Sequence, residues 1–264
     1  MNKRECIFCD SQDLSKEHIY SKWLFDLIKP DKGVFTPSFH IIEKSTSNEL
    51  IDRFLEDKSD GRVIRYNDFT LKQVCKNCNN GWMSELESSV KTIIFNLEND
   101  ENNSVSNINI EDALTLSQWA ILKIMLASLA SQKKIYFNKM SYNLIKKAII
   151  PEGFLVEGIR LNHSGLNFVI GGPIIRKSFE ISREELDFAA SKFYKASLQI
   201  GHIAFRISYL RTDIPVFRKQ IIRKMFLLYP YKSKLPFDDQ NECEIPNLEK
   251  FDLPLLNTQL VLHD

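Results

Sequence analysis

Three stretches of the chain place hydrophobic residues at the spacing of an α-helix. The first is residues 19–28, and the second is residues 84–98, whose apolar stripe consists of Leu86, Val90, Ile93, Ile94 and Leu97. Ser84 and Glu87 fit a capping box at the start of the second helix. The third helix is predicted over about 112–132, and its apolar face carries Leu116, Trp119, Leu122 and Leu126.

After residue 154 the pattern changes to the alternation that is typical of strands. Strands are predicted over 154–161, 166–172, 195–201 and 202–210, with helices near 140–149, 182–191 and 215–228. The polar, Asn-rich residues 99–109 predict a linker between a domain at 1–98 and a second domain at 110–264. The expected fold class is α+β, with an antiparallel sheet in the second domain.

Composition and charge narrow the classes of function. Hydrophobic residues make up 44% of the 264 positions, enough for a core, and the formal net charge is +1. A nucleic acid would therefore have to meet a local basic surface. The polar start of the chain indicates no signal peptide, and no run approaches the roughly 18 apolar residues of a membrane span. These features predict a cytoplasmic protein that does not bind membranes.

Four of the five cysteines form two CxxC pairs, Cys6 with Cys9 and Cys75 with Cys78. Two such pairs in a chain without a leader predict a tetrahedral zinc site, since thiolates are soft ligands. Four thiolates leave no open position, so this zinc would be structural and would join distant segments of the chain. Redox motifs or four free thiols are the alternative, and the lone Cys243 is expected to be an inert thiol.

Three motifs, CIFC at 6–9, KEHI at 16–19 and VCKNCN at 74–79, together resemble the HNH endonucleases. The active site of that family is a ββα-metal finger, and many members carry two zinc knuckles beside it. The resemblance covers roughly residues 5–90 and implies that the first domain is such a finger. The stretches EHI…KWL and CKNCNNGWMSELE are also similar to a bacterial subgroup associated with phage defence.

The resemblance implies specific residue roles. The acid–His pair of the family falls on Glu17 and His18, and its second metal ligand falls on Asn79. His18 would accept a proton from water, while Glu17 and Asn79 would hold a catalytic Mg²⁺ or Mn²⁺ and DNA would be cut to a 5′-phosphate and a 3′-hydroxyl. The residue types suit this chemistry, because imidazole titrates near neutral pH and hard cations prefer oxygen ligands.

Two positions depart from the family pattern. The central Asn of the family falls on Thr70, although Asn67 lies nearby and is a candidate replacement, and Glu17 stands where Asp is usual. These departures keep two alternatives open, a non-catalytic zinc-dependent module that binds nucleic acid and an RNA-cleaving toxin. If His18 is not the base, His40 is the next candidate.

Basic residues near the motifs are candidates for phosphate contacts, with a plain solvated surface as the alternative: Lys3, Arg4, Lys16, Lys22, Lys72 and Lys76. Trp23 and Trp82 are expected to cover the zinc site. Residues 110–264 carry no catalytic motif, and we expect them to position substrate or to bind another copy or a partner protein. Their best candidate for a nucleic-acid arm is the predicted helix within 217–226, with Arg218, Lys219, Arg223 and Lys224.

Overall fold

The structure is a computed structural model of the chain that describes residues 5–29, 34–35, 38–40, 64–99, 108–130, 137–171, 193–210 and 226–229. These ranges contain helices and mainly antiparallel sheets, which confirms the α+β class. The chain divides into two compact units. The first holds residues 1–35 and 64–151, and the second holds residues 36–63 and 152–264. The chain therefore passes from one unit to the other at 35/36, 63/64 and 151/152, and none of these points lies in the expected linker 99–109.

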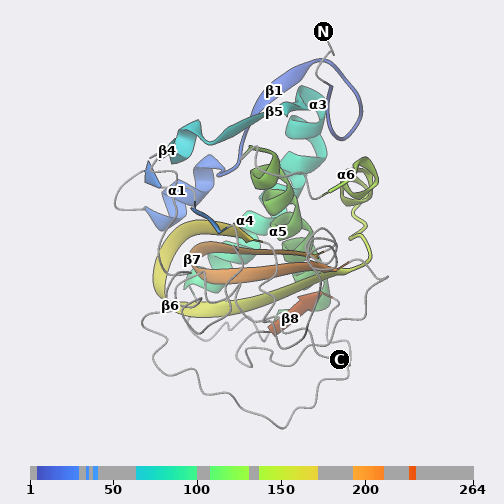
Figure 1. The fold of residues 1–264 in the computed structure, drawn as a ribbon. Helices are drawn as coiled ribbons and strands as arrows, with labels where there is room; N and C mark the ends of the chain where they lie inside the picture. The colour runs from blue at the N-terminus through green and yellow to red at the C-terminus, as the bar shows by residue number, and fades with distance from the viewer. Residues whose placement is uncertain are drawn as a thin grey trace, which may run out of the picture. The chain divides into compact units, whose positions relative to one another are not determined.

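A two-stranded antiparallel sheet forms the start of the first unit (Figure 1). Strand β1 (Leu14–His18) pairs with β5 (Thr70–Cys75), with Leu14 opposite Cys75 and His18 opposite Thr70. The register shifts between Ser15 and Glu17. Strand β1 was not predicted as a strand, because its sequence LSKEH contains a single apolar residue. The short strands β2 (Val34–Phe35) and β4 (Ile64–Arg65) form a second pair, and between these segments lie helix α1 (Lys22–Ile28) and the turn η1 (Tyr66–Asp68).

Strand β5 leads directly into a helical run. The run consists of the turn α3 (Lys76–Cys78), the irregular turn η2 (Asn79–Met83) and helix α4 (Ser84–Asn99). Gly81 interrupts the helical dihedral angles within η2, with φ −95° and ψ −117°. Helix α4 confirms the predicted helix at 84–98, but the predicted capping box is wrong. Ser84 has helical dihedral angles and continues the preceding turn, so it is not an N-cap, and the Glu87 side chain binds elsewhere.

Helix α5 (Ile110–Ala130) is buried on every side over most of its length. This differs from the single apolar face predicted for it, and even Lys123 in its middle is only 3% exposed. By length and hydropathy alone, α5 is long and apolar enough to cross a membrane, whereas the sequence had led us to expect no such run. The core helix of a soluble protein passes the same test, and 78% of the qualifying window is buried. Helix α6 (Lys139–Lys146) follows, with Asn138 as its N-cap.

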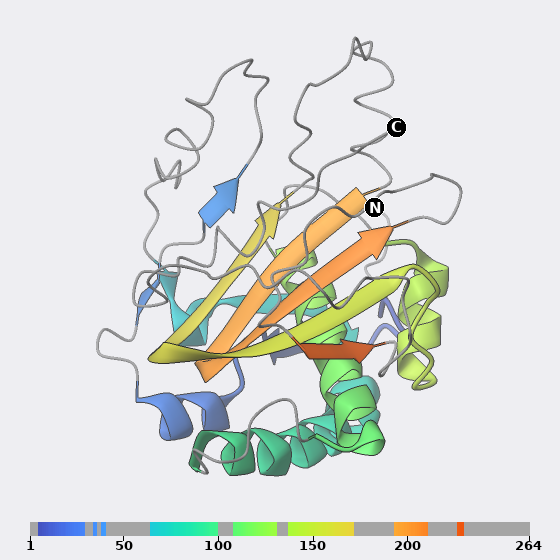
Figure 2. The same cartoon turned by 90° about the horizontal axis from the view of Figure 1, so that it is seen from below.

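The second unit is built on one sheet in which two long strands pair side by side (Figure 2). Strand β6 (Phe154–Gly171) is antiparallel to β7 (Phe193–Leu210), and it also pairs with β8 (Phe226–Tyr229) and, in parallel, with β3 (Ser38–His40). The four predicted strands thus merge into two. Their register shifts between Arg160 and Gly165, and Gly201, opposite Gly165, supplies the positive φ of 62° at this irregularity.

One predicted helix of the second unit ends in a strand instead, and another predicted helix is not described. Residues 226–228, predicted as the end of a helix, belong to strand β8. The predicted helix at 182–191 and the basic residues of 217–224 lie outside the described residues. Within the sheet, Glu157 and Arg206 face each other across β6 and β7 and form a buried bidentate ion pair, with both N–O distances at 2.6 Å.

Candidate metal centre and the charged network beside it

The four predicted cysteines come together in the first unit. The sulfur atoms of Cys6, Cys9, Cys75 and Cys78 all lie within 4.8 Å of one another, and Cys9 Sγ lies 3.4 Å from Cys75 Sγ and 3.6 Å from Cys78 Sγ. A tetrahedral zinc ion with bonds of about 2.3 Å requires sulfur atoms about 3.8 Å apart. The group could therefore hold a metal ion, and its spacing fits zinc.

Backbone amides support both halves of the cysteine group. The N–H of Phe8 points at Cys6 Sγ at 3.5 Å, and the N–H of Cys78 points at Cys75 Sγ at 3.4 Å. The backbone N–H of Ile7 donates to the carbonyl oxygen of Gln73 at 3.0 Å, which joins the turn at Cys6–Cys9, the first knuckle, to β5. Amides that face sulfur stabilise the thiolate form, which is the form that binds metal.

The thiols of the group differ in acidity. Burial raises the pKa of Cys6, and burial together with neighbouring thiols raises that of Cys78 to about 12. Burial also acts on Cys75, but the Cys78 amide and the neighbouring thiols outweigh it and bring its pKa down to about 7. The thiol of Cys75 is therefore more acidic than those of Cys6 and Cys78, and a metal ion that binds here would have to displace the protons of the latter two.

An aromatic cluster packs beside the first knuckle. The ring of Phe8 makes T-shaped contacts with Trp82 at 5.1 Å and with Tyr142 of α6 at 5.8 Å between centroids. Trp82 thus lies where a cover for the cysteine group was expected. Trp23 does not, because its indole nitrogen donates to Glu87 at 2.6 Å and its ring packs at 6.3 Å from that of Trp119.

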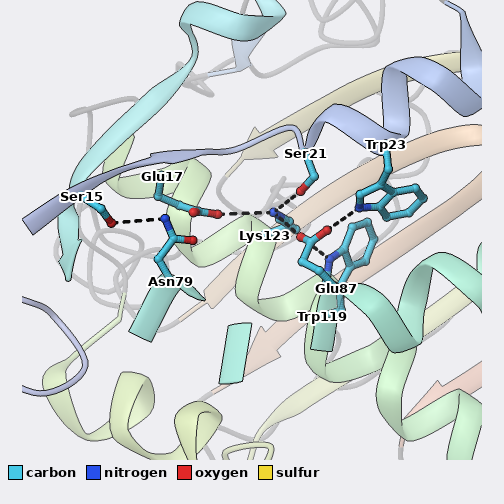
Figure 3. A network of polar contacts seen from close by, with 8 residues as sticks. All are labelled: Ser15, Glu17, Ser21, Trp23, Asn79, Glu87, Trp119 and Lys123. Carbon is cyan, nitrogen blue, oxygen red and sulfur yellow. Dashed lines mark hydrogen bonds and ion pairs between the residues drawn. The ribbon is translucent and has the colours of Figure 1, made fainter. Parts of the chain in front are cut away.

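Glu17 and Asn79 are neighbours, although they come from distant parts of the sequence. The pairing of β1 with β5 carries Glu17 alongside the turn after Cys78, and the Asn79 side chain points toward it (Figure 3). The Asn79 amide donates to Ser15 Oγ at 3.2 Å, and its proximity to the Glu17 carboxyl acts to lower the pKa of that group. An acid and an amide therefore lie together directly beside the cysteine group.

His18 faces away from this pair. Glu17 is 7% exposed, whereas His18, the next residue of the strand, is exposed, as the alternation of a strand requires. Lys16 of β1 and Lys72 of β5 are also exposed, on the positions that alternate with buried Glu17 and Leu71. The outer face of the β1–β5 pair thus presents one imidazole and two ammonium groups.

A buried lysine occupies the inner side of Glu17 (Figure 3). Lys123 Nζ of α5 lies 3.7 Å from Glu17 Oε1, 2.5 Å from Glu87 Oε1 and 3.2 Å from Ser21 Oγ. Trp23 and Trp119 both donate their indole N–H to the Glu87 carboxylate, at 2.6 and 2.9 Å. Glu87 is therefore the fully satisfied acid of this network, and Glu17 is only partly paired.

The pKa shifts of Glu17, Glu87 and Lys123 agree with this difference between the two acids. Burial raises the pKa of Glu17 above its ordinary value, and Lys123 opposes that shift without cancelling it. Burial acts in the same direction on Glu87, but Lys123 and the two indole donors hold the pKa of Glu87 below its ordinary value. Burial lowers the pKa of Lys123, yet Glu87 and then Glu17 keep it raised. Of the three charges, that on Glu17 is therefore the least favoured.

The network was missed in the sequence, although one signal for it was present. Lys123 is the only charged residue between Ala113 and Ala130, and a lone charge inside an apolar helix requires a buried partner. Glu87 was assigned to a helix cap, and Trp119 to a purely apolar face. Asn67 lies exposed in η1 and Thr70 begins β5 opposite His18, so neither joins Glu17.

The remaining residues that the sequence suggested for catalysis or phosphate contacts lie apart from Glu17 and Asn79 or outside the described side chains. His40 is placed in β3 of the second unit, where only its backbone is described, while Lys3, Arg4 and Cys243 lie outside the described residues. Lys76 is paired with Asp13 at 3.1 Å and Lys22 is exposed at the start of α1. Within the described ranges, the cysteine group is the one cluster of three or more His, Cys, Asp or Glu side chains that could hold an ion.

Comparison of the chain with protein-family models, with curated proteins and with solved structures finds no match.

Proposed function

We propose that the first unit is a zinc-stapled HNH-type finger that hydrolyses phosphodiester bonds in DNA. The observation that carries the proposal is the contact between Glu17 and Asn79 beside the cysteine group. The HNH resemblance assigns these two positions to one metal ion, and chain folding has brought them together from separate motifs. The setting in phage defence, which the same resemblance implies, is part of the proposal.

The zinc ion in this proposal is structural. Cys6, Cys9, Cys75 and Cys78 would bind it, and their sulfur spacing supports that assignment. Zinc would hold the amino-terminal knuckle against the end of β5. The register of β1 on β5, and with it the position of Glu17 beside Asn79, would then depend on zinc.

In the proposed reaction, water attacks phosphorus and the bond from phosphorus to the 3′-oxygen breaks. His18 is exposed and can accept the proton of the attacking water. Lys16 and Lys72, on the same outer face, would contact flanking phosphates. A Mg²⁺ or Mn²⁺ ion bound by Glu17 and Asn79 would supply positive charge for the leaving oxygen. Because Glu17 and His18 face opposite ways, the proposal requires a phosphate that reaches both faces of β1.

A second candidate function is a module that binds nucleic acid without cutting it. Two observations favour it. His18 and Glu17 lie on opposite faces of β1, and the cation beside Glu17 is the Lys123 ammonium. In such a module the outer face would still contact phosphates through Lys16 and Lys72, and zinc would still maintain the fold.

The experiment that separates the two is a plasmid-nicking assay with zinc-loaded protein, with Mg²⁺ or Mn²⁺ added or omitted. His18→Ala is expected to cut the rate by roughly 10²–10⁴ and to leave DNA binding intact, since a proton acceptor is lost. Lys16→Ala is the matched control on the same strand face. It should weaken binding at physiological salt but retain cleavage at saturating DNA.

The outcomes decide between the candidates. If the wild type binds DNA and RNA but cleaves neither, the nuclease proposal is excluded and the binding module is supported. Cleavage of RNA alone would indicate a toxin-like ribonuclease. Full cleavage by His18→Ala would contradict the assignment of His18 as the base.

A further inference from the structure

Two carboxylates share one ammonium in the Glu17–Lys123–Glu87 network, and they share it unequally. Lys123 Nζ lies 2.5 Å from Glu87 Oε1 but 3.7 Å from Glu17 Oε1, in a site where Lys123 is 3% and Glu17 is 7% exposed. When the Glu17 carboxyl is ionised, it therefore gains from an additional cation. Glu17 is the acid that lacks a close counter-charge, because its Oε1 atom lies 3.7 Å from Lys123 Nζ.

Lys123 does not depend on Glu17. Its ammonium retains Glu87 Oε1 at 2.5 Å and Ser21 Oγ at 3.2 Å, and it lies 6.0 Å from the centre of the Trp119 ring. These partners satisfy the cation even if the Glu17 carboxylate turns away. Glu17 also retains a partner, because the Asn79 amide lies on its other side.

We propose that Lys123 is an internal competitor of the divalent ion: it is the counter-charge of Glu17 in the ion-free protein, and it lowers the affinity of the Glu17–Asn79 pair for the ion. The inference rests on the proposed function and adds a positioning residue to it. A neighbouring positive charge repels an incoming cation, while removal of that charge leaves an acid that requires one. The finger would then bind the ion firmly only when phosphate oxygens supply further negative charge.

The test measures thermal unfolding of the full, zinc-loaded chain against Mn²⁺ concentration at constant ionic strength. Lys123→Met removes the ammonium and keeps the apolar stem. This variant should melt lower than the wild type without Mn²⁺, and Mn²⁺ should raise its Tm by on the order of 5 °C more than it raises that of the wild type. Half of the effect should require on the order of a tenth of the Mn²⁺ that the wild type needs.

Two control variants test whether the Mn²⁺ effect requires the Glu17 carboxylate and whether it is specific to Lys123. In the double variant Lys123→Met/Glu17→Gln the carboxylate is gone, so the Mn²⁺ effect should disappear. Lys139→Met removes an exposed ammonium that pairs with Asp10, and it should respond to Mn²⁺ as the wild type does. A purely structural role of Lys123 would lower Tm without creating any dependence on a divalent ion.

Three results would overturn the inference. They are an equal Mn²⁺ shift in Lys123→Met and wild type, a shift that survives in the double variant, and failure of Lys123→Met to fold with or without Mn²⁺. DNA cleavage is scored separately. If the wild type cleaves DNA but Mn²⁺ does not raise the Tm of Lys123→Met specifically, only the role of Lys123 is excluded. If Mn²⁺ raises the Tm of Lys123→Met but no form cleaves DNA, only the proposed nuclease activity is excluded.

Discussion

Lys123 lies 2.5 Å from Glu87 and forms with it a buried ion pair that joins helices α4 and α5. The side chain of Lys123 is 3% exposed and that of Glu87 is 17% exposed, and two tryptophan N–H groups complete the shell of the carboxylate. This pair fixes the helix that carries Lys123 beneath Glu17. The position of Glu17 beside Asn79 therefore depends on the Lys123–Glu87 ion pair as well as on the cysteine group.

We expect Glu87→Gln to destabilise the first unit strongly. The substitution leaves the Lys123 ammonium without its closest counter-charge, and breaking a buried pair from one side costs about 3–5 kcal/mol. Glu17→Gln is the matched control, since it removes the acid whose ionised form burial disfavours. It should change stability by less than about 1 kcal/mol or increase it. Urea unfolding followed by tryptophan fluorescence measures the unfolding free energy of both variants. Equal losses of stability would contradict the assignment of Glu87, and not Glu17, as the main counter-charge of Lys123.

The stability of the first unit should fall at acid pH through Glu87. Its pKa is lowered on folding, so the unfolded chain binds more protons and the contribution of Glu87 is complete above its ordinary value of 4.5. That contribution is lost as the pH falls from about 4.5 through the folded pKa. Glu17 has a raised pKa and acts in the opposite direction, so Glu17→Gln should steepen the net loss and Glu87→Gln should flatten it. Unfolding free energies measured between pH 3 and 7 check the signs.

Zinc should be present at one ion per chain, and Cys75→Ser should lose it. Because thiolate–zinc binding is coupled to folding, this variant should lose about 4–5 kcal/mol of stability or more. Cys243→Ser is the control, since Cys243 belongs to neither CxxC pair of the sequence. Metal analysis and thermal melts measure the two effects. A zinc-free wild type, with Cys75→Ser melting at the same temperature, would mean that the four thiols do not form a metal site.

Asn79→Ala and His18→Ala should respond differently to Mn²⁺. Loss of a metal ligand is a binding defect, so raised Mn²⁺ should restore part of the cleavage by Asn79→Ala. Loss of a proton acceptor is not repaired by an ion, and His18→Ala should stay low by roughly 10²–10⁴ at every Mn²⁺ concentration. A Mn²⁺ titration of plasmid nicking compares them. The same degree of rescue in both variants would mean that the two roles are assigned wrongly.

Local sequence determined much of the secondary structure. The apolar periodicity of residues 84–98 and 112–132 led to helices α4 and α5, and the alternation after residue 154 led to β6 and β7. These predictions succeed because the period of the pattern follows from backbone geometry alone. The spacing of the two CxxC pairs likewise predicted the cysteine group, since a two-residue gap turns both sulfurs of a knuckle toward one point.

Tertiary structure alone decided which of the charged residues meet. Glu87 fitted a capping box by its distance from Ser84, but α4 continues from the preceding turn and its backbone N–H groups need no such cap. Freed from that role, the carboxylate meets Lys123 and two indole groups from other elements. Whether an acid serves its own helix or a distant partner depends on what packs against it, and short-range spacing does not contain that information.

The motif KEHI fixed the order of Glu17 and His18, and the alternation of a strand then required them to face opposite sides. It did not fix which of the two would be buried. That was decided when β1 paired with β5 and α5 packed with Lys123 beneath Glu17, because a buried carboxylate is tolerated only beside a compensating cation. The sequence thus determined the chemical groups and their local geometry, and long-range packing determined their charge environment, because electrostatic partners are set by distance in space and not along the chain.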